Sequence, residues 1–241
     1  MQIHAIKTSV FREGEHLVPF IARFIKHLPE KSILVITSKI IALAERRTKT
    51  IESVKTKERL IRKESQFAIS TKYVWLTIKD GMVMASAGID ESNANGKLIL
   101  LPKNSFKAAG RIRGALCHHY RVKELGILIT DSRTMPLRSG VTGVTIGYAG
   151  FKGLHDYRGT PDIFGRKFRF SQTNVADGLA AAAVVLMGEG AEQRPLARIQ
   201  GAPVEFCDSI APTELLINPA DDIYRPFFNF LPKKPWERKK K

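Results

Sequence analysis

Apolar residues near the start of the chain repeat at helical spacing, and a continuous apolar run follows them. The spacing over residues 17–28 predicts an amphipathic helix, with Pro19 tolerated in its first turn and Pro29 as its stop. Residues 32–37, S-I-L-V-I-T, predict a buried strand, and their continuous apolar character indicates cover on both faces. A second helical stretch follows this strand directly.

Two further runs of strand-like residues lie on either side of a tight turn. Residues 74–79 and 82–87 flank Asp80-Gly81, a pair that permits positive φ angles and joins antiparallel strands. The sequence therefore predicts a β-hairpin, and this hairpin leads to Asp90.

The middle of the chain combines a helix with another strand. Residues 105–120, after the short apolar run 98–101, predict a helix that carries several basic residues. Residues 126–130 predict a strand that ends at Asp131.

Glycines become frequent after this strand. They permit turns, bulges or a cleft where the backbone approaches a ligand closely, and they are Gly140, Gly143, Gly147, Gly150, Gly153 and Gly159. Short β-like runs such as residues 144–146 lie between them, and residues 162–170 predict a strand or hairpin around Gly165.

The last regular elements are a helix and a strand. Residues 174–187 predict a helix with small alanines at its centre, capped by Thr173 or Asn174. The glycines in M-G-E-G, residues 187–190, permit a left-handed C-cap at its end. Residues 196–200 predict the final strand.

Helices that alternate with buried strands, together with a hairpin, predict an α/β fold of mixed sheets with flanking helices. We find no internal repeat and no clear linker before a proline-rich tail from about Pro219. We therefore expect a catalytic unit over residues 1–212, with room for two subdomains, and a C-terminal extension with a basic tail over residues 213–241.

Composition limits the class of protein. A chain of 241 residues can bury a sizeable core, and no apolar run approaches the roughly 18 residues of a membrane span. A secretory signal is not apparent, so we expect a cytoplasmic protein with no membrane partner. Cys117 and Cys207 are too few for a disulfide framework and lack metal-motif spacing, so we expect ordinary buried or half-buried thiols.

The net charge of +16 is large, and much of it lies in two stretches. The last nine residues, 233–241, contain six basic residues and one acid, which is typical of a disordered tail. The basic residues between Arg46 and Lys63 are interleaved with Glu52, Glu58 and Glu64, which indicates a solvated helical face. A basic nucleic-acid-binding protein without catalysis is thus an alternative, although neither stretch has a stacking pattern or a recognised module.

Two carboxylates lie just past strand-like runs. Asp90 follows the small-residue run at 85–89 and Asp131 follows the apolar run at 126–130. Mg²⁺ is commonly held by one or two carboxylates while phosphates and water complete its shell, and ligands gather at strand carboxyl ends. Turn or cap roles are the alternative for each residue alone. Their joint occurrence with Glu189 favours a metal and phosphate site.

Several motifs occur together in a characteristic order. They are A-G-I-D-E-S-N at 87–93, I-L-I-T-D-S at 127–132 followed by Arg138-Ser139-Gly140, G-Y-A-G at 147–150, D-I-F-G-R at 162–166, V-A-D at 175–177 and L-M-G-E-G at 186–190. In order and spacing they resemble the coenzyme F-420:L-glutamate ligase (F420-0:gamma-glutamyl ligase) family, which includes bacterial members labelled as folate-metabolism gamma-glutamate ligases. The resemblance spans about residues 8–201 and implies a gamma-glutamyl ligase-like fold, not a Rossmann fold.

The resemblance implies an amide ligase unrelated to ATP-grasp enzymes. Such a ligase uses GTP, with ATP as the open alternative, and Mg²⁺ or Mn²⁺ to join L-glutamate through its amine to a carboxylate acceptor by way of an acyl phosphate. The family name implies a deazaflavin acceptor, coenzyme F-420-0, while a folate-like pterin or another small carboxylate stays open. The family also implies a homodimer. A degenerate relative that binds nucleotide without catalysis is a further alternative.

The resemblance also assigns roles to residues of this chain. As metal ligands it implies Asp90, Asp131, Glu189 and Ser132, the last in place of a commoner threonine. As nucleotide-binding residues it implies Thr8, Ser9, Val10, Phe11, Ser38, Lys39, Asn93, Met187, Gly188, Gly190, Ala191, Glu192, Gln193 and Arg194. As catalytic residues we expect Lys39 and Arg138, which would hold phosphate or substrate charge.

Some of these positions have plainer interpretations, and others depart from the family pattern. Glu189 could be a polar helix end, and Lys39 a solvated first-turn residue. Leu43 stands where many relatives have a second lysine. Residues 132–137, S-R-T-M-P-L, replace a more usual pattern of threonine, asparagine or phenylalanine, glycine and arginine. These departures bear on nucleotide choice and acceptor specificity.

Overall fold

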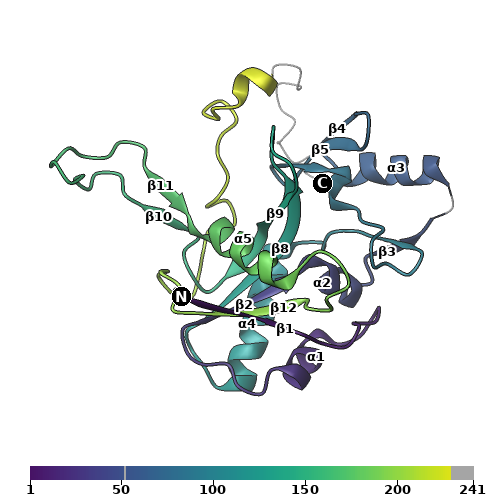
Figure 1. The fold of residues 1–241 in the computed structure, drawn as a ribbon, viewed down its shortest axis with the longest axis horizontal. Coiled ribbons are helices and arrows are strands. Elements are labelled where there is room, and N and C mark those ends of the chain that lie inside the picture. The colour runs from purple at the N-terminus through teal and green to yellow at the C-terminus, as the bar shows by residue number, and fades with distance from the viewer. Residues whose placement is uncertain (52, 229–241) are drawn as a thin grey trace.

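A five-stranded mixed sheet forms the centre of the molecule (Figure 1). The structure is a computed structural model, and it describes residues 1–51 and 53–228. The strand order is β1 (Gln2–Ile6), β12 (Leu196–Gln200), β2 (Ser32–Thr37), β8 (Leu125–Thr134) and β9 (Val141–Ala149). β2 and β8 run parallel, whereas the other neighbours pair antiparallel. The expected α/β class with mixed sheets and flanking helices is confirmed.

Helices cover both faces of this sheet, as the apolar run of β2 predicts. On one face Leu34 and Ile36 pack with α1 (Leu17–Phe24), α2 (Ser38–Ala44) and α4 (Ser105–Tyr120). On the other face Ile33 and Val35 pack with α5 (Val175–Met187). All four β2 side chains are fully buried, so alternate residues of one strand contribute to two separate cores.

Smaller elements are added to the carboxyl-end side of β2 and β8. They are β3 (Thr48–Thr50) with β7 (Lys97–Ile99), the sheet β4 (Phe67–Ser70), β5 (Trp75–Lys79) and β6 (Met82–Ala85), the helix α3 (Val54–Glu64) and the 3-10 turn η1 (Ser86–Gly88). The predicted hairpin is confirmed as β5 and β6. Its turn residues Asp80 and Gly81 both have positive φ, at 52° and 79°.

The glycine-rich middle of the chain differs from its prediction. β8 does not end at Asp131 but continues to Thr134, and β9 is one long strand where short runs were expected. A register shift between Ile129 and Thr130 lets the pairing continue beyond the predicted end of the strand. Asp131 is therefore a strand residue opposite Val144, and a turn or cap role does not apply to it.

Residues 154–174 form an arm that extends away from the sheet (Figure 1). Its strands, β10 (Leu154–Asp156) and β11 (Gln172–Asn174), lie outside the predicted segment 162–170. The chain does reverse at Gly165, where φ is 83°, beyond an isolated bridge between Pro161 and Lys167. The hairpin prediction was therefore correct for the bend and wrong for the position of the strands.

The first predicted helix ends early. α1 stops at Phe24, although apolar spacing continues to Leu28, because Ile25 turns to extended angles. The carbonyl oxygen of Ile25 accepts a hydrogen bond from the Tyr120 hydroxyl at 2.6 Å. Ile25 and Leu28 are still buried in the same core, so the apolar pattern predicted burial correctly but not the end of the helix.

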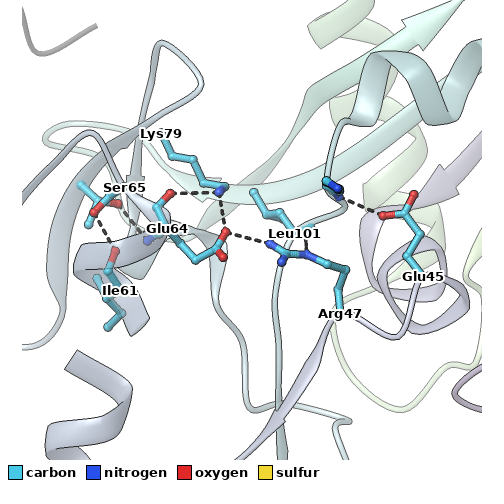
Figure 2. Close-up of polar contacts among 10 residues, drawn as sticks. Glu45, Arg47, Ile61, Glu64, Ser65, Lys79 and Leu101 are labelled. Atoms are coloured by element: carbon cyan, nitrogen blue, oxygen red, sulfur yellow. Dashed lines mark hydrogen bonds and ion pairs between the residues drawn. The ribbon is translucent and has the colours of Figure 1, made fainter. Parts of the chain in front are cut away.

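The expected solvated helical face at residues 46–64 is wrong in part. Among the described residues of this stretch only 54–64 are helical, and Arg47 and Glu64 are half-buried. Figure 2 shows that the Glu64 carboxylate accepts from Arg47 at 2.8 Å and from Lys79 at 2.9 Å. The side chains of Glu64 and Lys79 are only 16% and 11% exposed. We call these three residues the Glu64 network; it fastens α3 and β5 to the segment that leads into β3.

The remaining elements agree with the sequence. The helix and strand expected at 105–120 and 196–200 are α4 and β12, and Asn174 caps α5 by accepting from the Asp177 N–H. The strands β1, β3 and β4 were not predicted. Both cysteines are free and half-buried, as expected.

Beyond residue 212, Glu214 still packs against the sheet, accepting hydrogen bonds from the Tyr148 hydroxyl and from the Gly153 N–H. A short 3-10 turn, η2, covers Arg225–Phe228. The basic tail 233–241 lies outside the described residues. Over the part of the chain that is described, no helix has the length and apolar character to cross a membrane.

Candidate active site

A cavity of about 860 Å³ lies at the carboxyl ends of β2 and β8. Its walls come from five distant parts of the sequence: the segment after β1, the start of α2, residues 88–95, the second half of β8, and the loop after α5. A sixth part, the β5–β6 hairpin, closes one side. The structure thus gathers segments that are separated by more than 180 residues in the chain.

The cavity contains all of the residues expected to bind metal or nucleotide. Thr8, Ser9, Val10, Phe11, Ser38, Lys39, Asp90, Asn93, Asp131, Ser132 and residues 187–194 all line it. Parallel pairing explains part of this convergence, because Thr37 and Thr130 lie in register. Ser38 and Lys39, which follow the end of β2, therefore lie level with Asp131 within β8. Their individual roles remain predictions.

Lys39 is fixed on Asp90 and Ser92. Its ammonium donates to Asp90 Oδ2 at 2.8 Å, to the Ser92 carbonyl oxygen at 2.9 Å and to Ser92 Oγ at 2.9 Å. Asp90 in turn accepts from the Ser92 N–H and hydroxyl, both at 2.7 Å. The Lys39 side chain is 25% exposed, so it is a half-buried ion-pair partner and not a solvated first-turn residue.

The two predicted aspartate ligands have opposite pKa shifts. Burial alone would raise the pKa of Asp90, but the hydrogen bonds from Lys39 and Ser92 outweigh it and hold that pKa below its ordinary value. Burial raises the pKa of Asp131 above its ordinary value. The Arg133 charge opposes this shift, and the Asp90 charge adds a smaller upward effect. Two carboxylates that repel each other in one cavity form a site that attracts a cation.

The loop after α5 closes another side of the cavity. Ser132 Oγ donates to Glu189 Oε1 at 2.5 Å, so Glu189 is more than a polar helix end. Asn93 donates to the Gly190 carbonyl oxygen at 3.2 Å, and the Thr8 N–H donates to the Gln193 carbonyl oxygen at 2.9 Å. These bonds join three of the predicted nucleotide-binding segments to one another.

Gly188 ends α5 in a conformation that differs from the predicted left-handed cap. Its φ of 81° is positive as expected, but its ψ of 168° is extended. A Cβ here would lie 2.4 Å from the Glu192 carboxyl carbon, whose Oε2 accepts from the Gly190 N–H at 2.8 Å. The loop therefore folds around the Glu192 carboxylate, and the positive φ with an extended ψ favours glycine at position 188.

The donor chemistry of the cavity fits a hard cation, because Asp90, Asp131, Ser132 and Glu189 all offer oxygen. Within residues 1–51 and 53–228, however, no three His, Cys, Asp or Glu side chains gather as a ready metal cluster. Asp90 is held by Lys39, and Glu189 by Ser132. A cation would thus compete with Lys39 for Asp90.

Arg138 is placed apart from the other predicted residues. It lies exposed in the loop between β8 and β9, where its N–H bonds the Met135 carbonyl oxygen. The cavity lining stops at Thr134 and resumes at Val141. A clamp role for Arg138 remains a prediction and would require this loop to approach the cavity.

The sequence interpretation missed other cavity residues. Arg133 lines the cavity although it had been noted only as a departure from the family pattern, and Leu76 and Val83 line it from the hairpin. One signal could have identified Arg133, since residues two apart on a strand share a face and Asp131 was already a candidate. No local signal pointed to the hairpin residues. Leu43 also lines the cavity, so the position of the second family lysine is apolar here.

Comparison with known proteins adds a family to this geometry. The family model described as F420-0:Gamma-glutamyl ligase matches residues 5–201. A protein of Methanococcus maripaludis strain C7 named coenzyme F420:L-glutamate ligase is 32% identical over 216 residues, which cover 82% of this chain and 86% of that relative. A protein of the same name from strain C6 is 38% identical over 157 residues, covering 65% and 62%. Another, from Methanosarcina mazei, is 32% identical over 213 residues, covering 81% and 83%.

Proposed function

The chain belongs to the F420-0:gamma-glutamyl ligase family, and from this premise we propose that it is a ligase that adds L-glutamate to a carboxylate acceptor of the coenzyme F-420-0 type. We further propose that GTP drives the reaction through an acyl phosphate. One observation carries the proposal: the residues assigned to metal and nucleotide by sequence motifs alone all line one cavity. A structural role for each motif separately would not require them to meet.

The reaction needs activation because a carboxylate and an amine do not condense favourably in water. In the proposed sequence a carboxylate oxygen of the acceptor attacks the γ-phosphorus of GTP, and GDP leaves. The amine of glutamate then attacks the acyl carbon, and phosphate leaves with the oxygen that came from the carboxylate. Because phosphoryl transfer depends mainly on alignment and charge neutralisation, the cavity must supply cations and fixed donors.

The residues of the chain divide into two groups for this task. Lys39 is the ammonium best placed to neutralise phosphate charge, since it already sits on the Asp90 carboxylate inside the cavity. The loop 187–194 and the segment 8–11 would hold the nucleotide, and their mutual hydrogen bond supports a shared role. Asp90, Asp131, Ser132 and Glu189 would hold Mg²⁺ or Mn²⁺. When bound, such an ion neutralises and aligns the phosphate oxygens.

We also propose that the protein is a homodimer. The arm between β10 and β11 extends from the sheet and carries apolar side chains with no cover, of which Ile163, Phe164 and Phe170 are 91%, 88% and 89% exposed. Contiguous exposed apolar side chains are typical of an association surface. Light scattering of the purified protein tests this point, and replacing Phe164 and Phe170 by serine should give a monomer.

The activity is tested by incubating the protein with L-glutamate, Mg²⁺ or Mn²⁺, and GTP or ATP in parallel, against coenzyme F-420-0 and folate as acceptors. Mass spectrometry should detect an acceptor that has gained one glutamyl unit, with GTP preferred. Nucleotide-dependent thermal stabilisation without glutamylation of either acceptor would instead indicate a relative that only binds nucleotide.

A further inference from the structure

Arg133 is a cation that lacks a full set of partners inside the cavity. Its Nη1 donates to the Val83 carbonyl oxygen at 3.4 Å, whereas its Nε and Nη2 are buried with no hydrogen-bond partner among the described residues. A guanidinium has five N–H donors, and leaving buried donors without an acceptor is unfavourable. A residue that the fold keeps in this state is expected to meet an anion that binds from outside.

The strand places Arg133 on the side of the cavity away from the loop 187–194. Residues alternate between faces along β8, so Asp131 and Arg133 share a face while Ser132 points to the other. Ser132 is paired with Gly143, which packs against α5, and Ser132 bonds Glu189 in the loop beyond that helix. Arg133 therefore faces away from the loop 187–194, toward the backbone of β6.

The β4–β5–β6 sheet presents an apolar face beside Arg133. Register pairs Ile78 with Val83 and Leu76 with Ala85, so these four side chains share one face. Leu76, Val83 and Ala85 line the cavity, and Leu76 and Val83 are 37% and 42% exposed. This surface can pack against the body of a ligand but offers no charge to it.

A second cavity, of about 1010 Å³, continues from this apolar face. Ile78 and Val83 line it, so Val83 is shared by both cavities. Arg133 lines the first cavity and bonds the carbonyl oxygen of that shared residue. An elongated ligand with an anionic end at Arg133 would extend past Val83 toward the second cavity.

We propose that Arg133 binds the carboxylate of the acceptor, while the flat deazaflavin ring of the acceptor lies along Leu76, Ile78 and Val83 toward the second cavity. This inference rests on the proposed ligase function and names the binding position of its acceptor. Residues two apart on a strand are separated by roughly 6–7 Å, so a carboxylate on Arg133 would lie near a phosphate that a cation at Asp131 would hold. The acceptor carboxylate would thereby be positioned for phosphorylation.

The test compares Arg133→Met with Arg133→Lys and with Arg59→Met, a control on the exposed face of α3. Three quantities are measured for each: the Kd of coenzyme F-420-0 by calorimetry without nucleotide, the KM for F-420-0 and the KM for GTP. Loss of a bidentate charged contact should raise the acceptor Kd and KM roughly 10- to 100-fold in Arg133→Met, with KM for GTP unchanged. Arg133→Lys should keep part of the affinity, and Arg59→Met should match wild type.

A chemical control isolates the charge. The methyl ester of F-420-0 at its acceptor carboxylate should bind wild type more weakly than the free acid, and this difference should vanish in Arg133→Met. Leu76→Ser is an independent variant at an exposed position, and it should weaken acceptor binding severalfold without altering KM for GTP. An unchanged acceptor Kd in Arg133→Met, or an equal rise in the KM of both substrates, would overturn the inference.

The same measurements separate this inference from the proposed function. Wild type that glutamylates F-420-0 while Arg133→Met keeps its acceptor KM contradicts only the role of Arg133. Wild type that neither binds nor glutamylates F-420-0 contradicts both. Because Arg133→Met removes a buried unpaired charge, its melting temperature should not fall, and a large fall would show that Arg133 has a structural role.

Discussion

Two clusters of charged side chains lie on the same side of the central sheet, and they differ in how completely they are paired. In the Glu64 network, one carboxylate accepts from both Arg47 and Lys79, and Lys79 also donates to the Glu64 carbonyl oxygen (Figure 2). In the cavity, burial raises the pKa of the half-buried Asp131, and two buried nitrogens of Arg133 have no hydrogen-bond partner among the described residues. One cluster is internally satisfied, and the other is not.

The difference indicates which charges serve the fold and which serve a ligand. Satisfied charges join α3 and β5 to the segment before β3, and their loss should affect stability. Charges that are buried without full pairing weaken the fold and are expected where a substrate or a metal completes them. We therefore expect substitutions in the Glu64 network to lower stability with little effect on activity. Substitutions of the cavity charges should lower activity with little effect on stability.

The largest expected effect is on catalysis, from Asp131→Asn. Loss of a predicted cation ligand should lower kcat by about 1,000-fold, equivalent to about 4 kcal/mol, because charge on the transferred phosphate is no longer neutralised. The free energy of unfolding should stay equal or rise, since the variant removes a buried carboxylate whose pKa is raised. Steady-state kinetics and urea titration measure the two quantities, with the exposed Asp221→Asn as a control. If Asp131→Asn kept the wild-type kcat, the role of Asp131 as a cation ligand would be wrong.

The next effect is on stability, from Glu64→Gln. This substitution leaves Lys79 and Arg47 half-buried without a counter-charge and should lower the free energy of unfolding by about 3 kcal/mol. Glu58→Gln, on the same helix, should change it by less than about 0.5 kcal/mol. The kcat of folded Glu64→Gln should equal that of wild type. A lower kcat in Glu64→Gln without a lower free energy of unfolding would contradict the structural role of the Glu64 network.

The pH dependence of stability should show the same contribution of Glu64. Burial raises the pKa of Glu64, but the hydrogen bonds and charges of Lys79 and Arg47 outweigh it and leave the pKa lowered. A lowered folded-state pKa contributes stability above the unfolded-state value, near pH 4.3, and this contribution disappears as the pH falls through the folded-state value. The difference between wild type and Glu64→Gln should thus be full at pH 7 and shrink below about pH 4. A difference that is constant from pH 7 to pH 3 would contradict the network.

The smallest effect on stability is expected for Lys39→Met. The Asp90 carboxylate is 46% exposed, so water can replace the ammonium, and the free energy of unfolding should change by less than about 1 kcal/mol. The kcat/KM for GTP should nonetheless fall at least about tenfold, because phosphate charge loses its nearest ammonium. A loss of stability as large as that of Glu64→Gln would place Lys39 among the structural charges instead.

The sequence predicted most of the fold wherever a pattern was local. The apolar runs gave β2, β12 and α4, and the Asp80-Gly81 pair gave the hairpin. The extension of β8 escaped prediction because a register shift depends on the partner strand. At the early end of α1 the Ile25 carbonyl oxygen accepts from Tyr120, which lies 95 positions away. Pro29 has no N–H to bond that carbonyl, so the helix end had a local signal that the apolar spacing outweighed in the prediction.

The sequence predicted which residues form the site but not which of them bond to one another. Motifs indicated Asp90, Asp131 and Glu189, and the structure brings all three to one cavity. The ion pair between Lys39 and Asp90 could not be inferred, since the two residues are 51 positions apart in the sequence. The unusual property of Arg133 is that two of its buried nitrogens have no hydrogen-bond partner among the described residues. This property depends on the tertiary structure and not on the local sequence.

The most direct test of the proposed ligase reaction follows one oxygen atom. Coenzyme F-420-0 labelled with ¹⁸O in its acceptor carboxylate is incubated with GTP, Mg²⁺ or Mn²⁺, L-glutamate and the wild-type protein, and the released phosphate is analysed by mass spectrometry. With an acyl phosphate intermediate, we expect one ¹⁸O in the released phosphate for each glutamylated acceptor formed. Glutamylated acceptor with unlabelled phosphate would contradict the acyl phosphate, and phosphate release without any glutamylated acceptor would contradict the ligase itself.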